Sequence, residues 1–222
     1  MPIYALNDDI AFPHPSLASA DGLLAVGGDL KLERLLLAYE NGIFPWFNEE
    51  DPPLWWSPPQ RAVLFPEETR ISKSMMQELR KPGYEVKFNT DFNSVIKHCQ
   101  QSRIDAEGTW ITQEFIDVYT QLHEMGIAHS VETYYEGELV GGLYGLTFGD
   151  VFCGESMFSL RSNASKIALI RLSERLIEKE FQVIDCQITN PHLVSMGARE
   201  ITREDFLTIL HDSSKNKKEN LF

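Results

Sequence analysis

Cysteine is scarce in this sequence, and no two cysteines form a pair. Cys99, Cys153 and Cys186 are odd in number and far apart, and no CxxC motif occurs. This argues against a disulfide framework and against a thiolate zinc site. His123 and His129 are six residues apart, which is not a ligand-like spacing. We therefore expect neither a metal nor another cofactor.

Long apolar runs are also missing. No stretch approaches the roughly 18 to 20 consecutive apolar residues that span a bilayer. The first residues, MPIYALNDDIAFPHP, lack the basic start and the apolar run of a signal peptide. We therefore expect a cytoplasmic protein that does not bind a membrane.

Positive charge is the third shortage, with 20 Lys and Arg against 33 Asp and Glu and a formal net charge of -13. This balance argues against broad electrostatic adhesion to nucleic acid. It leaves room for a local basic patch, and basic residues do gather at residues 70–81 and 161–175. An acidic protein suits a positively charged substrate. The charge gives no reason for association, so we expect a monomer.

The 222 residues divide by composition into two regions. Residues 1–61 are rich in proline, glycine and aromatics, and we expect a small domain there with one helix at about 31–40. Asp29 is the expected cap of this helix and Gly42 its stop. Residues 62–222 have the patterns of a mixed α/β domain. The expected fold class is therefore α+β, with the small N-terminal domain packed on the larger one.

The second region alternates between strand and helix patterns. Apolar, β-branched and aromatic runs predict strands at 61–65, 84–89, 128–135, 138–149, 151–159 and 181–188. Helical periodicity predicts helices at 72–80, 91–101, 112–125, 163–179 and 202–211. Short turns between the middle strands predict an antiparallel meander, and the long helix before the last strand allows a parallel crossover. This order resembles the outline of GNAT-type acyltransferases, which alone does not fix the chemistry.

The last strand pattern, FQVIDCQI, ends in polar residues. Asp185 and Gln187 are two residues apart, so they should share one face of the strand, with Cys186 on the other. Three interpretations compete: a catalytic edge, a thiol or metal site, and a polar strand end that caps backbone amides. Asp185 could act as a general base or orient Gln187, whose amide could bind an amine and a developing oxyanion. A thiol nucleophile would need a base, for which only His192 is near.

The segment GGLYGLTFGDVFCGESMFS contains a second group of candidates. Glycines within the strand at 141, 142 and 145 indicate close approach of a ligand or of another backbone. Leu143 and Met157 could line an apolar pocket or belong to the ordinary core. Glu155 lies in a strand that looks buried on both sides, so it needs a partner, which a cationic substrate could supply.

Large aromatic residues are dense in residues 39–56, without helical periodicity. They are Tyr39, Phe44, Trp46, Phe47, Trp55 and Trp56. They could pin a loop-rich domain onto the rest of the chain, or form a platform for nucleobases, each stacked base contributing about 1–3 kcal/mol. Trp110 and Tyr119 could complete such a platform.

Several blocks occur together and in one order from about residue 10 to residue 211. They are GLLAVGGDL, GIFPWF, WWSPPQRAVLFP, EGTWIT, HSVE, GGLYG, FCGESMFS, NASKIAL, IDCQITNPHLVSMGA and I-x-R-x-x-F. With these blocks the chain resembles the bacterial leucyl/phenylalanyl-tRNA–protein transferase family. The resemblance implies transfer of Leu or Phe, and also Met, from aminoacyl-tRNA to proteins with N-terminal Arg or Lys. It implies an N-degron product that is then degraded, and no cofactor.

The resemblance also implies roles for individual residues. The terminal adenosine of the tRNA would be surrounded by Tyr39, Trp46, Trp110 and Tyr119. The aminoacyl side chain would lie among Leu143, Met157, Leu169, Leu172 and Ile184, of which positions 143 and 172 are often Met and Phe in the family. Glu155, Asp185 and Gln187 would surround the reacting centre. Whether Asp185 or Gln187 handles the proton stays open.

Two rival functions differ in what they require of the sequence. An acetyl-CoA enzyme needs a glycine-rich turn at the start of the long helix to hold the pyrophosphate. That place reads SLRSNASK, and no glycine occurs between Gly154 and Gly197, which disfavours acetyl-CoA. A non-catalytic module that binds tRNA or N-degrons is the other rival, and only a transfer assay separates it from the enzyme.

Overall fold

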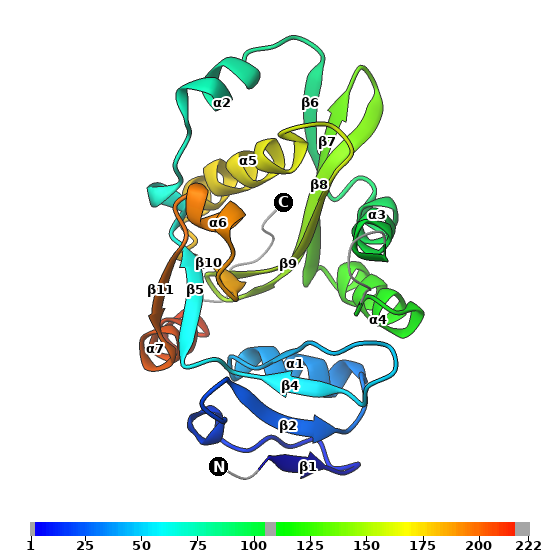
Figure 1. Ribbon diagram of the computed structural model, residues 1–222, viewed down its shortest axis with the longest axis vertical. Coiled ribbons are helices and arrows are strands. Elements are labelled where there is room, and N and C mark those ends of the chain that lie inside the picture. The colour runs from blue at the N-terminus through cyan, green and yellow to red at the C-terminus, as the bar shows by residue number, and fades with distance from the viewer. Residues whose placement is uncertain (1–2, 105–109, 216–222) are drawn as a thin grey trace.

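The computed structural model describes residues 3–104 and 110–215 and contains two β-sheets (Figure 1). The smaller sheet has the strand order β1-β2-β4-β3. Its elements are β1 (Tyr4–Leu6), β2 (Leu23–Gly27), α1 (Leu32–Glu40), β3 (Phe44–Pro45) and β4 (Leu54–Trp56). The helix was predicted from the sequence, whereas the strands were not, because each has only two to five residues.

The larger sheet has the order β11-β5-β10-β9-β8-β7-β6 in the described residues. Its strands are β5 (Gln60–Leu64), β6 (Tyr84–Phe88), β7 (Ala128–Tyr135), β8 (Glu138–Phe148), β9 (Val151–Ser159), β10 (Val183–Gln187) and β11 (Arg199–Thr202). Strands β6 to β9 form the predicted antiparallel meander. Strand β10 is parallel to β9, which confirms the crossover. The short edge strand β11 was not predicted.

Helices cover both faces of the larger sheet. They are α2 (Lys73–Glu78), α3 (Phe92–Ile104), α4 (Gln113–Glu124), α5 (Ala164–Glu178), α6 (Pro191–Ser195) and α7 (Arg203–Ser213), with short 3₁₀ turns at Pro15–Leu17 and Pro66–Glu68. Figure 1 shows α3 and α4 on one side of β8 and α5 on the other. Successive residues of β8 point to opposite faces of the sheet: Tyr144 packs with α3 and α4, and Leu143 packs with α5. The fold class is mixed α/β, as predicted.

The long helix α5 approaches the sheet closely. Its apolar stripe of Ala164, Ala168, Leu172 and Leu176 is fully buried, as the spacing predicted. A Cβ atom at Gly141 would lie 2.5 Å from the Cβ of Ala164. Gly141 therefore allows the close approach of a helix.

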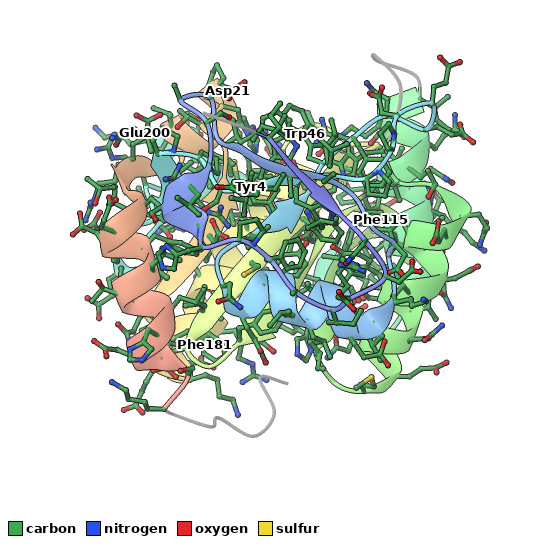
Figure 2. The ribbon with its side chains drawn as sticks, turned by 90° about the horizontal axis from the view of Figure 1, so that it is seen from below. Tyr4, Asp21, Trp46, Phe115, Phe181 and Glu200 are labelled. Carbon is green, nitrogen blue, oxygen red and sulfur yellow. The ribbon has the colours of Figure 1, made fainter. Side chains whose placement is uncertain are left out.

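The two sheets share one apolar core. A single cluster of buried side chains contains Leu24 and Trp55 from the smaller sheet and Tyr144 and Val151 from the larger one. Seen from below, the N-terminal segment lies across the end of the larger sheet, between α7 and α4 (Figure 2). The chain passes from one sheet to the other at residues 57–59. A division into domains at residue 61 stays a prediction, and its ends at residues 1–2 and 216–222 lie outside the described residues.

Arg34 of α1 fixes the N-terminal segment. Its side chain is fully buried and donates to the Asp29 carboxylate at 3.0 Å and to the carbonyls of Asp9 and Asn7 at 3.1 and 2.9 Å. The sequence predicted Asp29 as the cap of α1. In the structure Lys31 occupies the N-cap position without a side-chain hydrogen bond, and Asp29 is held by Arg34.

We expect Arg34→Met to lower the free energy of unfolding by about 3 kcal/mol, because the substitution leaves two carbonyls and a carboxylate without their donor. Urea denaturation followed by tryptophan fluorescence measures this change. Lys31→Met is the matched control: Lys31 also pairs with Asp29 but is 65% exposed, and its removal should leave the midpoint unchanged. Equal midpoints for both variants would contradict the role given to Arg34.

Candidate functional site

A cavity of about 610 Å³ opens between the larger sheet, α5 and the segment that follows α1. Its apolar end contains all five side chains that the sequence predicted for an acyl pocket. They are Leu143 on β8, Met157 on β9, Leu169 and Leu172 on α5, and Ile184 on β10. Phe152 and Leu193 complete this end and were not predicted. The resemblance to the family implied these five positions, and the sheet order brings them together.

Two tryptophans form a further wall of the cavity, the tryptophan wall. Trp46, labelled in Figure 2, and Trp110 both line it, with ring centroids 6.4 Å apart and planes at 89°. The indole N–H of Trp56 donates to the carbonyl of Trp46 at 2.7 Å, which fixes the backbone there. Trp46 remains 42% exposed, so its ring is available for stacking by a planar ligand.

Tyr39 and Tyr119, predicted beside these tryptophans, lie elsewhere. They are 2% and 0% exposed and are not among the residues that line the cavity. Their ring faces are covered, since Tyr39 stacks on Phe148 and Tyr119 on Phe115. Their hydroxyl groups are 2.6 Å apart. The rings of Tyr39 and Tyr119 therefore do not form the cavity wall, and their hydroxyl groups reach it through Glu155, to which both donate. Their place around the terminal adenosine stays a prediction.

Glu155 is the point on which these hydroxyl groups converge. Its carboxylate accepts from Tyr39 at 2.7 Å, from Tyr119 at 3.2 Å and from the Gln187 side-chain amide at 3.0 Å. The partners that its buried position requires are thus neutral donors from three elements. Burial raises the pKa of Glu155 to about 7, against the opposing effect of the Tyr39 hydroxyl. The carboxyl group lines the cavity and can exchange a proton near neutral pH.

A β-bulge aims Glu155 at the cavity. Along β8 and β9, Tyr144 pairs with Ser156 and Gly145 with Gly154, so Glu155 is the extra residue. An extra residue interrupts the alternation of side chains and redirects one of them. Gly145 permits this arrangement, because a Cβ atom there would lie 2.3 Å from the carbonyl oxygen of Cys153.

A second bulge corrects the expectation for the strand end at 185–187. On β5, Val63 pairs with Asp185 and Ala62 with Gln187, so Cys186 is the extra residue, and Gln187 has a φ of 62°. Asp185 and Gln187 therefore do not share a face. Gln187 and Cys186 line the cavity, and Asp185 does not.

Asp185 is engaged by a residue that sequence reasoning did not select. Arg61 donates from Nε and Nη2 to the two oxygens of Asp185 at 2.8 and 2.6 Å, and both side chains are buried. Asp185 Oδ1 also accepts from the backbone N–H of Gln187 at 2.9 Å. The available signal was an arginine at the start of an apolar strand, RAVLF, since a charge in such a strand needs a buried partner.

The thiol and metal interpretations find no support in the geometry. Cys186 faces the cavity, contrary to expectation, but burial raises its pKa well above the usual range. The described residues contain no group of three or more His, Cys, Asp and Glu side chains arranged to hold a metal ion. Within residues 3–104 and 110–215, each helix is too short or too polar to cross a bilayer.

The cavity thus combines apolar side chains, a tryptophan wall and a hydrogen-bonded carboxyl–amide pair. On a meander–helix–strand fold, this arrangement defines an enzyme that transfers an acyl group. Comparison with known families agrees with this class. The model of the leucyl/phenylalanyl-tRNA protein transferase matches residues 63–211, and that of the N-terminal domain of the same proteins matches residues 28–59. The chain belongs to the leucyl/phenylalanyl-tRNA–protein transferase family.

Individual relatives extend over nearly the whole chain. A leucyl/phenylalanyl-tRNA–protein transferase from Syntrophobacter fumaroxidans is 53% identical over 96% of this chain and 92% of its own length. One from Flavobacterium johnsoniae is 53% identical over 94% of this chain and 99% of its own. Among solved structures, a GCN5-related N-acetyltransferase from Kribbella flavida is 10% identical, covers 74% of this chain and 58% of that one, and has a TM-score of 0.38.

We expect Arg61→Met to lower the free energy of unfolding by about 3–5 kcal/mol, because it leaves the Asp185 carboxylate buried without its counter-charge. Thermal and urea unfolding measure this. Arg199→Met is the control, since Arg199 pairs with Glu68 at the surface and its loss should not be measurable. The double variant Arg61→Met, Asp185→Leu should be more stable than Arg61→Met alone. An Arg61→Met protein as stable as the wild type would contradict this account.

Proposed function

We propose that this enzyme transfers Leu or Phe, and also Met, from aminoacyl-tRNA to the α-amino group of proteins that begin with Arg or Lys. The product would carry an N-degron in the cytoplasm and be degraded. The observation that carries the proposal is the cavity itself: apolar side chains, the Glu155 and Gln187 side chains, and Trp46 and Trp110 all line one space. The membership of the family supports the same reaction.

The reaction needs positioning and one proton acceptor. The α-amine attacks the ester carbonyl carbon, a C–N bond forms, and the C–O bond to the ribose breaks. The amine loses a proton and the ribose hydroxyl gains one, so the step balances without ATP. About a tenth or more of an α-amine with a pKa near 7.7–8.0 is already neutral at pH 7. The enzyme therefore has to hold the two reactants together and move the proton.

The apolar end of the cavity supports selection of the aminoacyl group. Its five predicted side chains are all apolar, and each methylene buried against them contributes roughly 0.8 kcal/mol. Leu, Phe and Met can bury their side chains in it. Val and Ile carry a branch at Cβ, so shape excludes them. The tryptophan wall would stack the terminal adenine.

The hydrogen bonds divide the polar residues into two roles. Glu155 is within reach of the cavity and titrates near neutral pH, so it is our candidate for accepting the amine proton. Gln187 donates to Glu155 through Nε2, which leaves its side-chain oxygen to accept from the amine. Both oxygens of Asp185 are held by Arg61. Asp185 is then a positioning residue that fixes the backbone of Gln187.

A transfer assay tests the function. Purified protein is incubated with radiolabelled Leu-tRNA and an acceptor protein that begins with Arg, and an acceptor that begins with acetylated Arg serves as the control. Label should enter only the acceptor with a free amine. Absence of label from both acceptors, at enzyme concentrations where tRNA binds, would leave a non-catalytic binding module as the correct description.

The raised pKa of Glu155 predicts two pH effects. The carboxylate is the active form, so kcat should rise with pH through about 7, and Glu155→Gln should lose about 100-fold in kcat together with this inflection. The folded pKa is above the usual 4.5, so the wild type binds an extra proton when folded. Its stability relative to Glu155→Gln should therefore fall as pH rises from about 4.5 to 7. If kcat of Glu155→Gln still showed the inflection near pH 7, this would contradict the role of Glu155 as proton acceptor.

A further inference from the structure

Arg103 lies near the end of α3 and lines the same cavity. Its guanidinium carbon is 5.0 Å from the centroid of the Trp110 ring. Within the described part of the chain it has no ion pair, and its buried Nε has no hydrogen-bond partner. Among the residues described as lining the cavity, no other is Lys or Arg. Neither the proposed reaction nor the packing of the core uses this cation.

The other enclosed arginines all have acceptors. Arg34 donates to a carboxylate and two carbonyls, Arg61 to a carboxylate and a carbonyl, and Arg203 to the carbonyl of Ser57. A partly buried charge without a counter-charge or an acceptor destabilises the fold. Arg103 therefore has the properties of a binding group whose partner arrives with the ligand.

The buried hydroxyl group of Tyr144, beside Arg103, is also free to bind a group of the ligand. Tyr144 of β8 is fully buried and lines the cavity, and its hydroxyl group has no hydrogen-bond partner among residues 3–104 and 110–215. The charge of Arg103 acts on the Tyr144 hydroxyl and opposes the rise of its pKa that burial causes. A guanidinium and a hydroxyl, both unpaired, thus border the tryptophan wall from the side of α3.

We propose that Arg103 binds the phosphodiester that joins the terminal adenosine to the nucleotide before it, with the Tyr144 hydroxyl as an accessory donor. The proposal rests on the proposed function. When the adenine stacks on Trp46 and Trp110, its 5′-phosphate is the nearest anion, since the adenosine and the acyl ester carry no negative charge. An arginine held against an aromatic face presents its N–H groups in a plane, which suits a phosphate.

Charge makes this contact important for the whole protein. At a net charge of -13, long-range electrostatics oppose the approach of tRNA. A single contact between Arg103 and a tRNA phosphate inside the cavity attracts the acceptor end locally. This attraction does not depend on the charge of the protein surface. It also separates tRNA-linked aminoacyl esters from free ones, because only the former carry the phosphodiester.

The test compares three donors that share the phenylalanyl ester: Phe-tRNA, the dinucleotide phenylalanyl-CpA with one phosphodiester, and phenylalanyl-adenosine with none. Arg103→Met should raise the KM for the first two about 10- to 100-fold, with kcat little changed. The KM for phenylalanyl-adenosine should not change. Arg103→Lys should recover part of the loss, and the dependence of log KM on log salt should weaken by about 0.7 in Arg103→Met.

Arg199→Met is the matched control, because Arg199 pairs with Glu68 at the surface and lies outside both groups of basic residues, so its KM values should equal those of the wild type. A rise in KM that is equal for all three donors would show that Arg103 only supports Trp110, and would overturn the proposal. A rise in the KM of the acceptor protein alone would assign Arg103 to a peptide carboxylate and overturn it too. If the wild type transfers from none of the donors, the proposed function fails first.

Discussion

The buried pair of Arg61 and Asp185 is the interaction on which the rest of the site depends. Besides its two bonds to Asp185, Arg61 donates to the carbonyl of Gly42 at 3.2 Å and lies 4.7 and 4.5 Å from the ring centroids of Phe44 and Phe206. One side chain thus connects β5, β10, the segment after α1, and α7. Burying two charges has a large desolvation cost, and here it fixes the strand end that presents Gln187 to the cavity.

Two β-bulges in the larger sheet direct the side chains of Glu155 and Gln187 toward each other. Without these bulges, the side chains of β9 and β10 would alternate regularly between the two faces of the sheet, and those of Glu155 and Gln187 would not meet. An extra residue in each strand brings the carboxylate and the amide together at 3.0 Å. The donors from Tyr39 and Tyr119 then hold the carboxylate from below. The chemistry therefore depends on irregularities of backbone pairing as much as on the identity of the side chains.

The sequence indicated the regular parts of the molecule, because periodicity is a local property. The stripe of α5 and the meander could both be located from it, whereas the five apolar pocket residues were placed only by the resemblance to the family. The bulge at Cys186 could not, since the register of a strand is set by its partners, and its shift reversed the expected orientation of Asp185. Arg61 was missed for the same reason: its partner lies 124 residues away. The strands of the smaller sheet are too short for any pattern to show.

The group that holds Glu155 has a consequence for how the chain acquires activity. Tyr39, Tyr119 and Gln187 are separated from Glu155 by 116, 36 and 32 residues, so the carboxylate is complete only after contacts of high sequence separation have formed. Such contacts close late during folding because each requires a large loop. A growing chain on the ribosome cannot assemble the centre before β10 has emerged. The carboxylate therefore lacks its full set of donors until most of the chain has been made.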